Sequence, residues 1–499
     1  MLDSRRILLV DLNNFARYPS LAVGYLAASL RKAGAQVQVF APLMVGVQGV
    51  QREVPPGRFG LLAAQLNHRA ATSPRAWVRE TRERMAAPQR SDIHAHARET
   101  LQGFREAFAS AQPHAVLVST YLMYREVCEQ LCAVAQEAGV PVLVGGPYFT
   151  PREVIDDWVR IPGLSALVAG EIELELPQVL QTLLSGGDLS AHSGVITHGA
   201  RGGVRGRVAA PLRRLDAVPH PDFGDFPWAA YPNRIVPVIT GRGCGWGACR
   251  FCSDITSTAG RTFRSRSAAD VLAEVGGQHR RHGASRFVFT DLKLNSDLGM
   301  WRALHAGMQE AAPGAQWIGA IHAGLEADNG LAEADLCAAA ASGCVRLTTG
   351  LETGSQRLLD RMKKGTRIEV VSAALHAAAA AGISCRCTMI LGYPGETAED
   401  VQASTDFLAR HEAVIERVSL NRLQLIAGTA LHRLARAQPE RLPDFAIEAE
   451  SPRDAQVRTR NRALEAPAHR RAAMRLLAAV HRINARPLSA RAHAFEGVM

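Results

Sequence analysis

Lysine, aromatic residues and long apolar runs are all scarce in this chain of 499 residues. Only four lysines accompany 53 arginines, and aromatic residues make up 6% of the sequence. The formal net charge is +10, yet no basic run is interleaved with aromatics, so nucleic-acid binding is not expected. The arginine bias is typical of a GC-rich genome, and a small anionic substrate remains open.

A stretch of about 20 uncharged apolar residues, as a membrane-spanning helix needs, is also absent. The first six residues run straight into a strand-like segment, so no leader is expected. Nine cysteines are too few for a disulfide framework in a chain of this length. With 47% hydrophobic residues, we expect a globular protein of two or three domains, located in the cytoplasm, with no membrane partner.

Three of the nine cysteines lie close together. Cys244, Cys249 and Cys252 fall within nine residues and are separated by Gly-rich turns. Such a set of thiolates suits an iron-sulfur cluster, and a 4Fe-4S cubane held by three cysteines keeps one iron free for a small molecule. The alternative is a zinc site, which needs a fourth ligand, and the next Cys or His along the chain is His279. We predict the cluster.

The N-terminal part alternates between apolar strands and amphipathic helices. Strands are expected at 7–11, 37–40, 115–120 and 142–147, with a polar, helical insertion near 44–112. This alternation predicts a parallel sheet, and such sheets bind ligands beyond the carboxyl ends of their strands. The candidate binding residues in those turns are Pro19, Ser20, Gly24, Thr120, Gly145, Gly146, Pro147, Gly170 and Glu171.

A second series of strands follows a Gly-, Arg- and Pro-rich segment at 190–234, which we interpret as a linker. The strand at 235–240 leads directly into the cysteine segment, the position where βα barrels carry their chemistry. Five further strands are expected at 286–291, 317–322, 345–351, 383–391 and 418–425. The residues from 431 onward include a helical run at 470–483 and predict a helical cap.

These motifs resemble the radical SAM superfamily, and in particular the class with an N-terminal cobalamin (B12)-binding domain. The resemblance rests on the cysteine segment with Phe251, the Gly-Tyr-Pro-Gly-Glu-Thr turn at 392–397, and the N-terminal turns. Most of the superfamily spaces its cysteines by three residues and then two, whereas this chain has four and then two. The resemblance implies an α/β fold in four parts: a Rossmann-like, flavodoxin-like B12-binding-type domain (1–189), the linker (190–234), a partial (β/α)6 TIM barrel (235–430) and a helical C-terminal region (431–499).

The resemblance also implies which residues meet the cofactors. Cys244, Cys249 and Cys252 would bind the 4Fe-4S cluster. The residues expected to contact S-adenosylmethionine (SAM) are Phe251, Asp291, Glu352, Ser355, Arg386, Gly392 and Asn421. Cobalamin would be held by the N-terminal turns without a histidine from the Asp-x-His-x-x-Gly motif, which is absent. An N-terminal domain that keeps the fold and binds nothing is the alternative, and no catalytic side chain is assigned.

The implied function is reductive cleavage of SAM followed by cobalamin-dependent methyl transfer to an unactivated carbon in specialised metabolism. The substrate would be a small molecule or peptide, and a flavodoxin- or ferredoxin-type protein would supply electrons. The alternative reaction transfers a 3-amino-3-carboxypropyl group to a small acceptor such as a heteroatom oxyanion, with the B12-like domain empty. A non-enzymatic cobalamin or redox sensor is a hypothesis of a different class.

Overall fold

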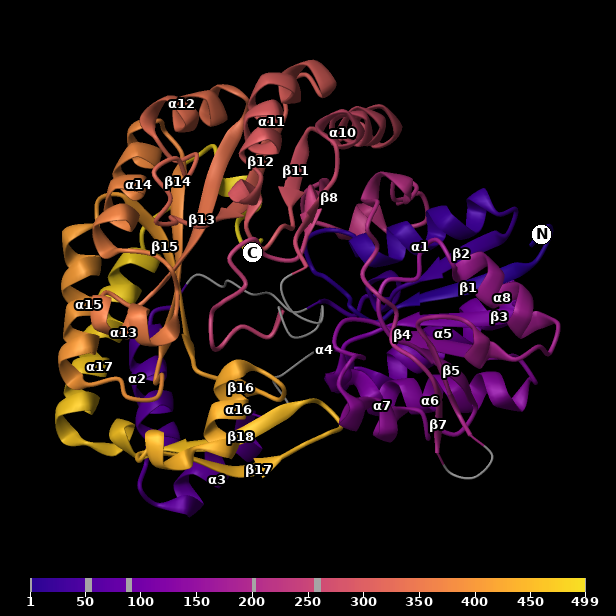
Figure 1. Cartoon of the computed structure of the whole chain (residues 1–499), viewed down its shortest axis with the longest axis horizontal. Coiled ribbons are helices and arrows are strands. Elements are labelled where there is room, and N and C mark those ends of the chain that lie inside the picture. The colour runs from indigo at the N-terminus through magenta and orange to yellow at the C-terminus, as the bar shows by residue number, and fades with distance from the viewer. Residues whose placement is uncertain (1, 50–55, 87–91, 200–202, 255–261, 499) are drawn as a thin grey trace.

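Two largely parallel sheets organise the computed structural model, which describes residues 2–49, 56–86, 92–199, 203–254 and 262–498. One sheet lies in the N-terminal half and one in the C-terminal half of the chain, and loops from both meet in the middle of the molecule (Figure 1). The predicted α/β fold class is confirmed.

The N-terminal sheet has seven strands within the described residues, in the order β2-β1-β3-β4-β5-β6-β7. The first five are parallel, and β6 and β7 are added antiparallel at one edge. The order of the parallel strands is that of flavodoxin-like folds, as expected. The strands are β1 Arg6–Asp11, β2 Gln36–Phe40, β3 Ala115–Ser119, β4 Val142–Gly145, β5 Leu164–Val168, β6 Val195–His198 and β7 Val204–Gly206.

Helices cover both faces of this sheet. In β1, Ile7 and Leu9 pack in the core with α1 and α8, whereas Leu8 and Val10 pack with α5, α6 and α7. A strand buried on both faces is a continuous apolar run, which is why residues 7–10 were recognisable in the sequence. These helices are α1 Leu21–Lys32, α5 Ala97–Ala111, α6 Arg125–Glu137, α7 Arg152–Trp158 and α8 Leu176–Leu184.

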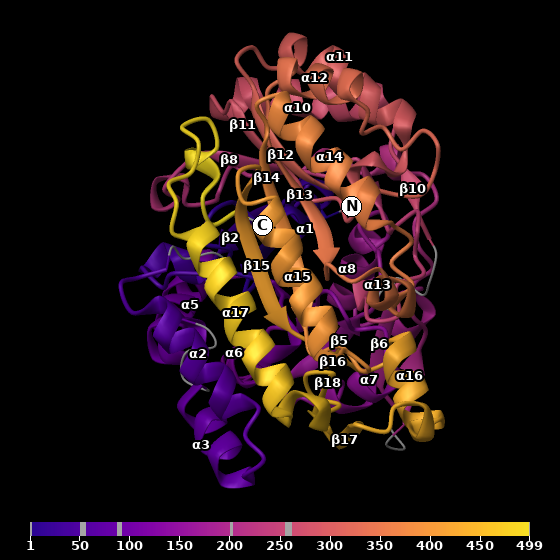
Figure 2. The same ribbon diagram turned by 90° about the vertical axis from the view of Figure 1, so that its left-hand side faces the viewer.

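The helical insertion expected near 44–112 contains α2 Gly60–Ala71, α3 Ala76–Ala86, α4 Asp92–Ala95 and α5. The α2 helix leaves the N-terminal domain and packs against α17 (Pro467–Asn484) on the outside of the second domain (Figure 2). Through α2, the insertion in the N-terminal part of the chain therefore contacts the C-terminal helix α17.

The second sheet has six parallel strands within the described residues, in the order β15-β14-β13-β12-β11-β8. β8 and β15 are its two edges, so the barrel is partial, as expected. The strands are β8 Ile235–Val238, β11 Arg286–Phe289, β12 Gln316–Ile321, β13 Cys344–Glu352, β14 Ser384–Leu391 and β15 Ile415–Arg422. The helices are α10 Ala268–His282, α11 Leu298–Ala311, α12 Glu333–Ala341, α13 Gln356–Met362, α14 Ile368–Ala380 and α15 Ala398–Arg410.

Besides β5, which was not among the expected strands, two segments carry strands that were not predicted. Within the segment expected as a linker, β6 and β7 complete the N-terminal sheet. The C-terminal region is helical in α16 (Ala430–Ala437) and α17, but it also contains β17 (Phe445–Glu450) and β18 (Gln456–Asn461), which pair with β16 (Leu425–Ile426). These strands have two to six residues, and none contains the continuous apolar run that marks a strand buried on both faces.

Candidate functional site

A cavity of about 920 Å³ lies where the carboxyl ends of the two sheets face each other. Loops after β1, β3, β4 and β5 line one side, and loops after β8, β11, β12 and β13 line the other. This is the edge at which parallel α/β sheets bind ligands, and the volume is at the upper end of the range of about 300–1,000 Å³ for small-molecule sites.

The three clustered cysteines all line this cavity. Cys244, Cys249 and Cys252 are half-buried and form no disulfide, whereas five of the other cysteines are buried and Cys337 is exposed. Burial raises the pKa of the Cys249 thiol to about 11, and the nearby Lys364 ammonium opposes the shift. Within the described residues, no three His, Cys, Asp or Glu side chains stand close enough to hold a single metal ion. The three cysteines that could bind a cluster therefore line one shared cavity.

The cysteine loop is fastened to the turn that follows α13. The Trp246 indole N–H donates to the Lys363 carbonyl at 2.8 Å, and the Arg250 N–H donates to the Met362 carbonyl at 3.0 Å. Gly365 has a φ of +68°, and a Cβ there would stand 2.4 Å from the Trp246 ring. Only glycine fits this close approach. His279, the distant candidate zinc ligand, lies on α10 and contacts the Ala284 carbonyl instead.

Asp291, predicted to face SAM, lines the cavity and also fixes the start of the cysteine segment. Its carboxylate accepts hydrogen bonds from the Thr240 backbone N–H, the Thr240 hydroxyl at 2.7 Å and the Gly241 N–H at 2.9 Å. Burial raises its pKa to about 6, against the lowering effect of these bonds. Asp291 thus holds the end of β11 to the end of β8, directly before the cysteines.

Glu352 ends β13 and pairs with Lys364 inside the cavity. The Lys364 ammonium lies 2.6 Å from Glu352 Oε1, and the two side chains are only 12% and 6% exposed. Burial opposes the charge on Lys364, but Glu352 and the thiols of Cys249 and Cys252 outweigh it and raise the lysine pKa. Glu352 also has a φ of +60°, a strained backbone of the kind that gathers at functional sites. Lys364 was not predicted from the sequence, where its one signal is the rarity of lysine in this chain.

The other predicted SAM contacts divide into two groups. Phe251 and Arg386 line the cavity. Ser355, Gly392 and Asn421 do not: Asn421 is exposed at the end of β15, and the other two belong to a polar network behind the site.

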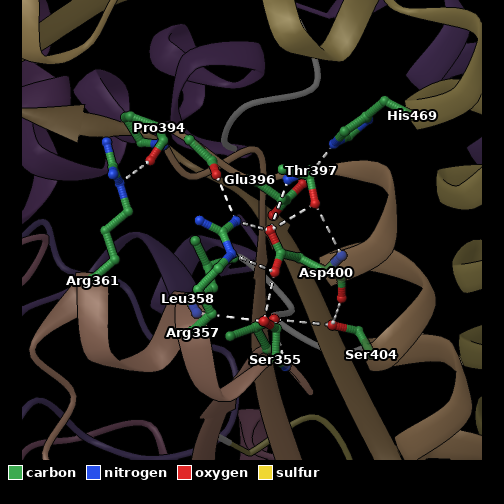
Figure 3. A network of polar contacts seen from close by, with 12 residues as sticks. Ser355, Arg357, Leu358, Arg361, Pro394, Glu396, Thr397, Asp400, Ser404 and His469 are labelled. Atoms are coloured by element: carbon green, nitrogen blue, oxygen red, sulfur yellow. Dashed lines mark hydrogen bonds and ion pairs between the residues drawn. The ribbon is translucent and has the colours of Figure 1, made fainter.

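That network centres on Asp400 and is drawn in Figure 3. The Ser355 hydroxyl, the N-cap of α13, donates to Asp400 Oδ1 at 2.6 Å, and Thr397 and Asp400 form a capping box at the start of α15. The Gly392 N–H donates to both Glu396 carboxylate oxygens at 3.1 Å, and His469 of α17 lies 2.8 Å from Glu396 (Figure 3). These residues shape the turn after β14 rather than line the cavity.

Most of the residues predicted to hold cobalamin do line the cavity. They are Ser20, Gly145, Gly146, Pro147, Gly170 and Glu171. At Gly146 a Cβ would stand 2.0 Å from the Thr120 carbonyl oxygen, and φ there is +153°, so glycine is required.

Pro19, Gly24 and Thr120 do not line the cavity. A Cβ on Gly24 would stand 2.5 Å from the Phe223 ring, so this glycine serves packing. Thr120 is fully buried, and its hydroxyl donates to the Tyr121 carbonyl.

Glu171 has a second role that the sequence did not suggest. It pairs with Arg264 at 2.7 Å and with Arg242 at 3.4 Å, and Arg242 also pairs with Glu173 at 2.8 Å. Burial opposes ionisation of Glu171, but the arginines and the Leu212 N–H outweigh it and lower its pKa. These ion pairs connect the turn after β5 to the strand that leads into Cys244.

The N-terminal half of the cavity also contains features that the sequence analysis missed. A ring of aromatic side chains, namely Phe15, Tyr18, Tyr121 and Tyr148, lines it. The Asn13 amide, also in the lining, donates to Asp11 at 2.9 Å, to the Ser20 hydroxyl and to the Ser119 hydroxyl. Asn13, Phe15 and Tyr18 lie in the loop after β1, whereas Tyr121 follows β3 and Tyr148 follows β4, so no single local motif contains all of them.

Comparisons with known proteins agree with this geometry. Residues 238–408 match the radical SAM superfamily. The chain is 27% identical over 300 residues to an uncharacterized methyltransferase of Pyrococcus horikoshii, covering 58% of this chain and 62% of that protein. The chain therefore spans less than two thirds of that relative. No helix among the described residues is long and apolar enough to cross a membrane.

Two solved structures share the fold over nearly the whole chain. One is the cobalamin-dependent SAM radical enzyme OxsB with aqua-cobalamin bound, with a TM-score of 0.70 and 16% identity, covering 92% of this chain and 64% of OxsB. The other is the radical SAM methyltransferase TsrM of Kitasatospora setae with cobalamin and a 4Fe-4S cluster bound. Its TM-score is 0.66 at 17% identity, covering 98% of this chain and 90% of TsrM. At such identities the likeness is one of fold.

Proposed function

Because residues 238–408 belong to the radical SAM superfamily, we propose that this chain is a cobalamin-dependent radical SAM methyltransferase. The observation that carries the proposal is the shared cavity: the cysteine loop and the carboxyl edge of a flavodoxin-like sheet open into the same space of about 920 Å³. The fold likeness to two cobalamin-binding structures supports it.

On the barrel side, Cys244, Cys249 and Cys252 hold the cluster, because they are the three thiols that face the cavity. When bound, a reduced cluster supplies the electron that cleaves SAM beside its sulfonium. SAM has a carboxylate and an ammonium on its methionine part. The Lys364 ammonium and the Glu352 carboxylate, held 2.6 Å apart, offer a complementary pair of charges for these groups. Phe251 and Arg386 complete this side of the site.

On the sheet side, the backbone around Gly145, Gly146 and Gly170 would allow close approach of a large ligand, and the aromatic side chains that line the cavity would provide apolar contacts for it. Bound cobalamin would supply the methyl group to be transferred. The apolar and aromatic side chains of the lining would limit the access of water to the reacting groups. We propose a small-molecule or peptide substrate with an unactivated carbon, from specialised metabolism, bound between the two cofactors.

The cluster is tested by anaerobic reconstitution of the wild type and of the single Cys244→Ala, Cys249→Ala and Cys252→Ala variants. We expect each variant to lose the visible absorbance of the cluster. Cys337→Ala, which removes an exposed cysteine outside the cavity, is the matched control and should keep it. Full cluster content in any of the three loop variants would contradict the proposed ligand set.

The cobalamin site is tested by filling the cavity. Ala22 on α1 lines it with an exposed side chain, and Ala109 on α5 is exposed elsewhere. We expect Ala22→Trp to lose bound cobalamin and keep the cluster, and Ala109→Trp to keep both. Formation of 5′-deoxyadenosine and S-adenosylhomocysteine supports methyl transfer, whereas methylthioadenosine without bound cobalamin would support 3-amino-3-carboxypropyl transfer instead.

A further inference from the structure

A second, much smaller pocket lies behind the cysteine loop. It has a volume of about 70 Å³ and shares no lining residue with the main cavity. Three arginines and four other side chains surround it, namely Arg250, Arg361, Arg441, Tyr393, Leu431, Leu434 and Leu442. We call it the three-arginine pocket.

The three guanidinium groups lack acidic partners. Among the described residues, no carboxylate lies within 4 Å of any of them. Each donates one side-chain hydrogen bond to a neutral oxygen: Arg250 to the Arg361 carbonyl at 3.3 Å, Arg361 to the Pro394 carbonyl at 2.9 Å, and Arg441 to the Gln438 amide at 2.8 Å. A guanidinium has five N–H donors, so most of them remain for a ligand.

The contrast with the neighbouring Arg357 is informative. Arg357 forms an ion pair with Asp400 and donates to the Gly395 carbonyl, whereas Arg361, one helical turn later, points away from Asp400 toward Pro394 (Figure 3). Like charges gathered without counter-charges repel one another, so such a group is suited to receive an anion.

One residue that lines the pocket is adjacent in sequence to a proposed cluster ligand. Arg250 directly follows Cys249 and stands two positions before Cys252. Its backbone is fixed from both sides, because its N–H donates to Met362 at 3.0 Å and its carbonyl accepts from Leu431 at 2.8 Å. On the other side of the loop, Phe251 lines the main cavity and its ring packs edge-on against Tyr393, which lines the pocket. The loop therefore separates the sulfurs from the three arginines.

We propose that the three-arginine pocket is the docking point for an acidic side chain of a one-electron protein reductant. This rests on the proposed function, which requires that the cluster receive electrons while the main cavity holds SAM, cobalamin and substrate. The reductant loses one electron and the cluster gains one, while the docked carboxylate is unchanged. A volume of about 70 Å³ admits one carboxylate but no flavin, so the redox group itself would stop at the surface beside the loop.

The test compares two electron sources for the reconstituted enzyme with SAM: a reduced, acidic flavodoxin, and reduced methyl viologen, a small cation that needs no anion site. The variant is Arg361→Gln/Arg441→Gln. The control, Arg152→Gln/Arg205→Gln, removes the same charge from exposed arginines of the N-terminal domain, which are 77% and 60% exposed. Flavodoxin binding is measured separately by its dissociation constant as a function of sodium chloride concentration.

We expect the pocket variant to lose about tenfold or more in flavodoxin-driven SAM cleavage and in flavodoxin affinity at low salt, with a weaker salt dependence. Its activity with methyl viologen should match the wild type, and the control should resemble the wild type in both assays. An equal loss in the control, or a loss with methyl viologen as well, would overturn the docking assignment. Inhibition by inorganic phosphate with no change in flavodoxin affinity would reassign the pocket to a free anion. A wild type that assembles no cluster would sink the proposed function itself.

Discussion

Removal of the Arg242 guanidinium is expected to weaken the contact between the two sheets, because it removes the ion pairs of Arg242 with Glu171 and Glu173. Arg242 lies on β9 (Gly241–Arg242), two residues before Cys244, and reaches Glu173 at 2.8 Å and Glu171 at 3.4 Å. The three side chains are 15%, 13% and 18% exposed. The guanidinium also covers the Tyr25 ring at 5.4 Å. This ion pair is largely withdrawn from water, unlike a surface pair, whose net value is about 0–1 kcal/mol.

Arg242→Gln leaves Glu173 with no cationic partner among the described residues, because its one ion pair is with Arg242. Breaking a buried pair from one side costs about 3–5 kcal/mol. Arg264→Gln is the matched control, since Glu171 then keeps Arg242. There we expect a smaller loss of about 1.5–3 kcal/mol, the value of hydrogen bonds to a charged group. Adding Glu173→Gln to Arg242→Gln removes the uncompensated carboxylate and should restore at least about 1 kcal/mol.

The assay is urea unfolding followed by both tryptophan fluorescence and far-UV circular dichroism, because two domains need not unfold in one step. Cluster content after reconstitution is a second readout, since Arg242 positions the chain just before Cys244. A loss below about 1 kcal/mol for Arg242→Gln, or an equal loss for Arg264→Gln, would refute the reasoning that this arginine holds the interface together.

Two further predictions concern buried ionisable groups: Asp11, which accepts from the cavity-lining Asn13, and Lys364, which lines the cavity. Burial raises the pKa of Asp11 to about 7, about three units above its ordinary value of ~3.9, so its stabilising contribution is present below about pH 4 and is lost as pH rises to about 7. In urea unfolding, the free energy of unfolding of Asp11→Asn should therefore rise relative to that of the wild type by up to about 4 kcal/mol as the pH is raised from 4 to 8. A difference between the two proteins that stays constant with pH would contradict this. Lys364→Gln should raise the KM for SAM by about 10- to 100-fold, the loss of one charge-assisted hydrogen bond. Lys363→Gln, the exposed neighbour, should leave KM unchanged, and equal effects in both would remove Lys364 from the SAM site.

The predictions that succeeded depend on signals that are local in the chain. Apolar runs such as residues 7–10 and 235–238 mark buried parallel strands, and the alternation of strands with helices predicts both sheets. The three cysteines within nine residues line one cavity in the structure, and their role as cluster ligands stays a prediction. Strands with a weaker hydrophobic pattern were missed. β17 and β18 are antiparallel surface strands with charged residues on their solvated sides, and such a charge-rich segment is equally compatible with a surface helix.

The side chains of the site that the sequence did not predict come together only in three dimensions. Glu173 and Arg242 lie on different domains, and Phe15, Tyr121 and Tyr148 follow three different strands. Conversely, Gly24 and Ser355 belong to motifs that resemble those of the family, yet in this structure one packs against Phe223 and the other caps a helix. A motif identifies a turn, but whether its side chains reach the ligand depends on the packing around that turn.

The four-residue spacing between the first two cysteines has a structural counterpart in this packing. The longer loop contains Trp246, which donates to the Lys363 carbonyl and covers Gly365, while Arg250 at the far end of the loop binds the Met362 carbonyl. Lys364 stands between these anchor points, and its ammonium reaches Glu352 inside the cavity. The contacts of Trp246 and Arg250 with residues 362–365 therefore hold the Lys364 ammonium beside the three cysteines, on the same cavity.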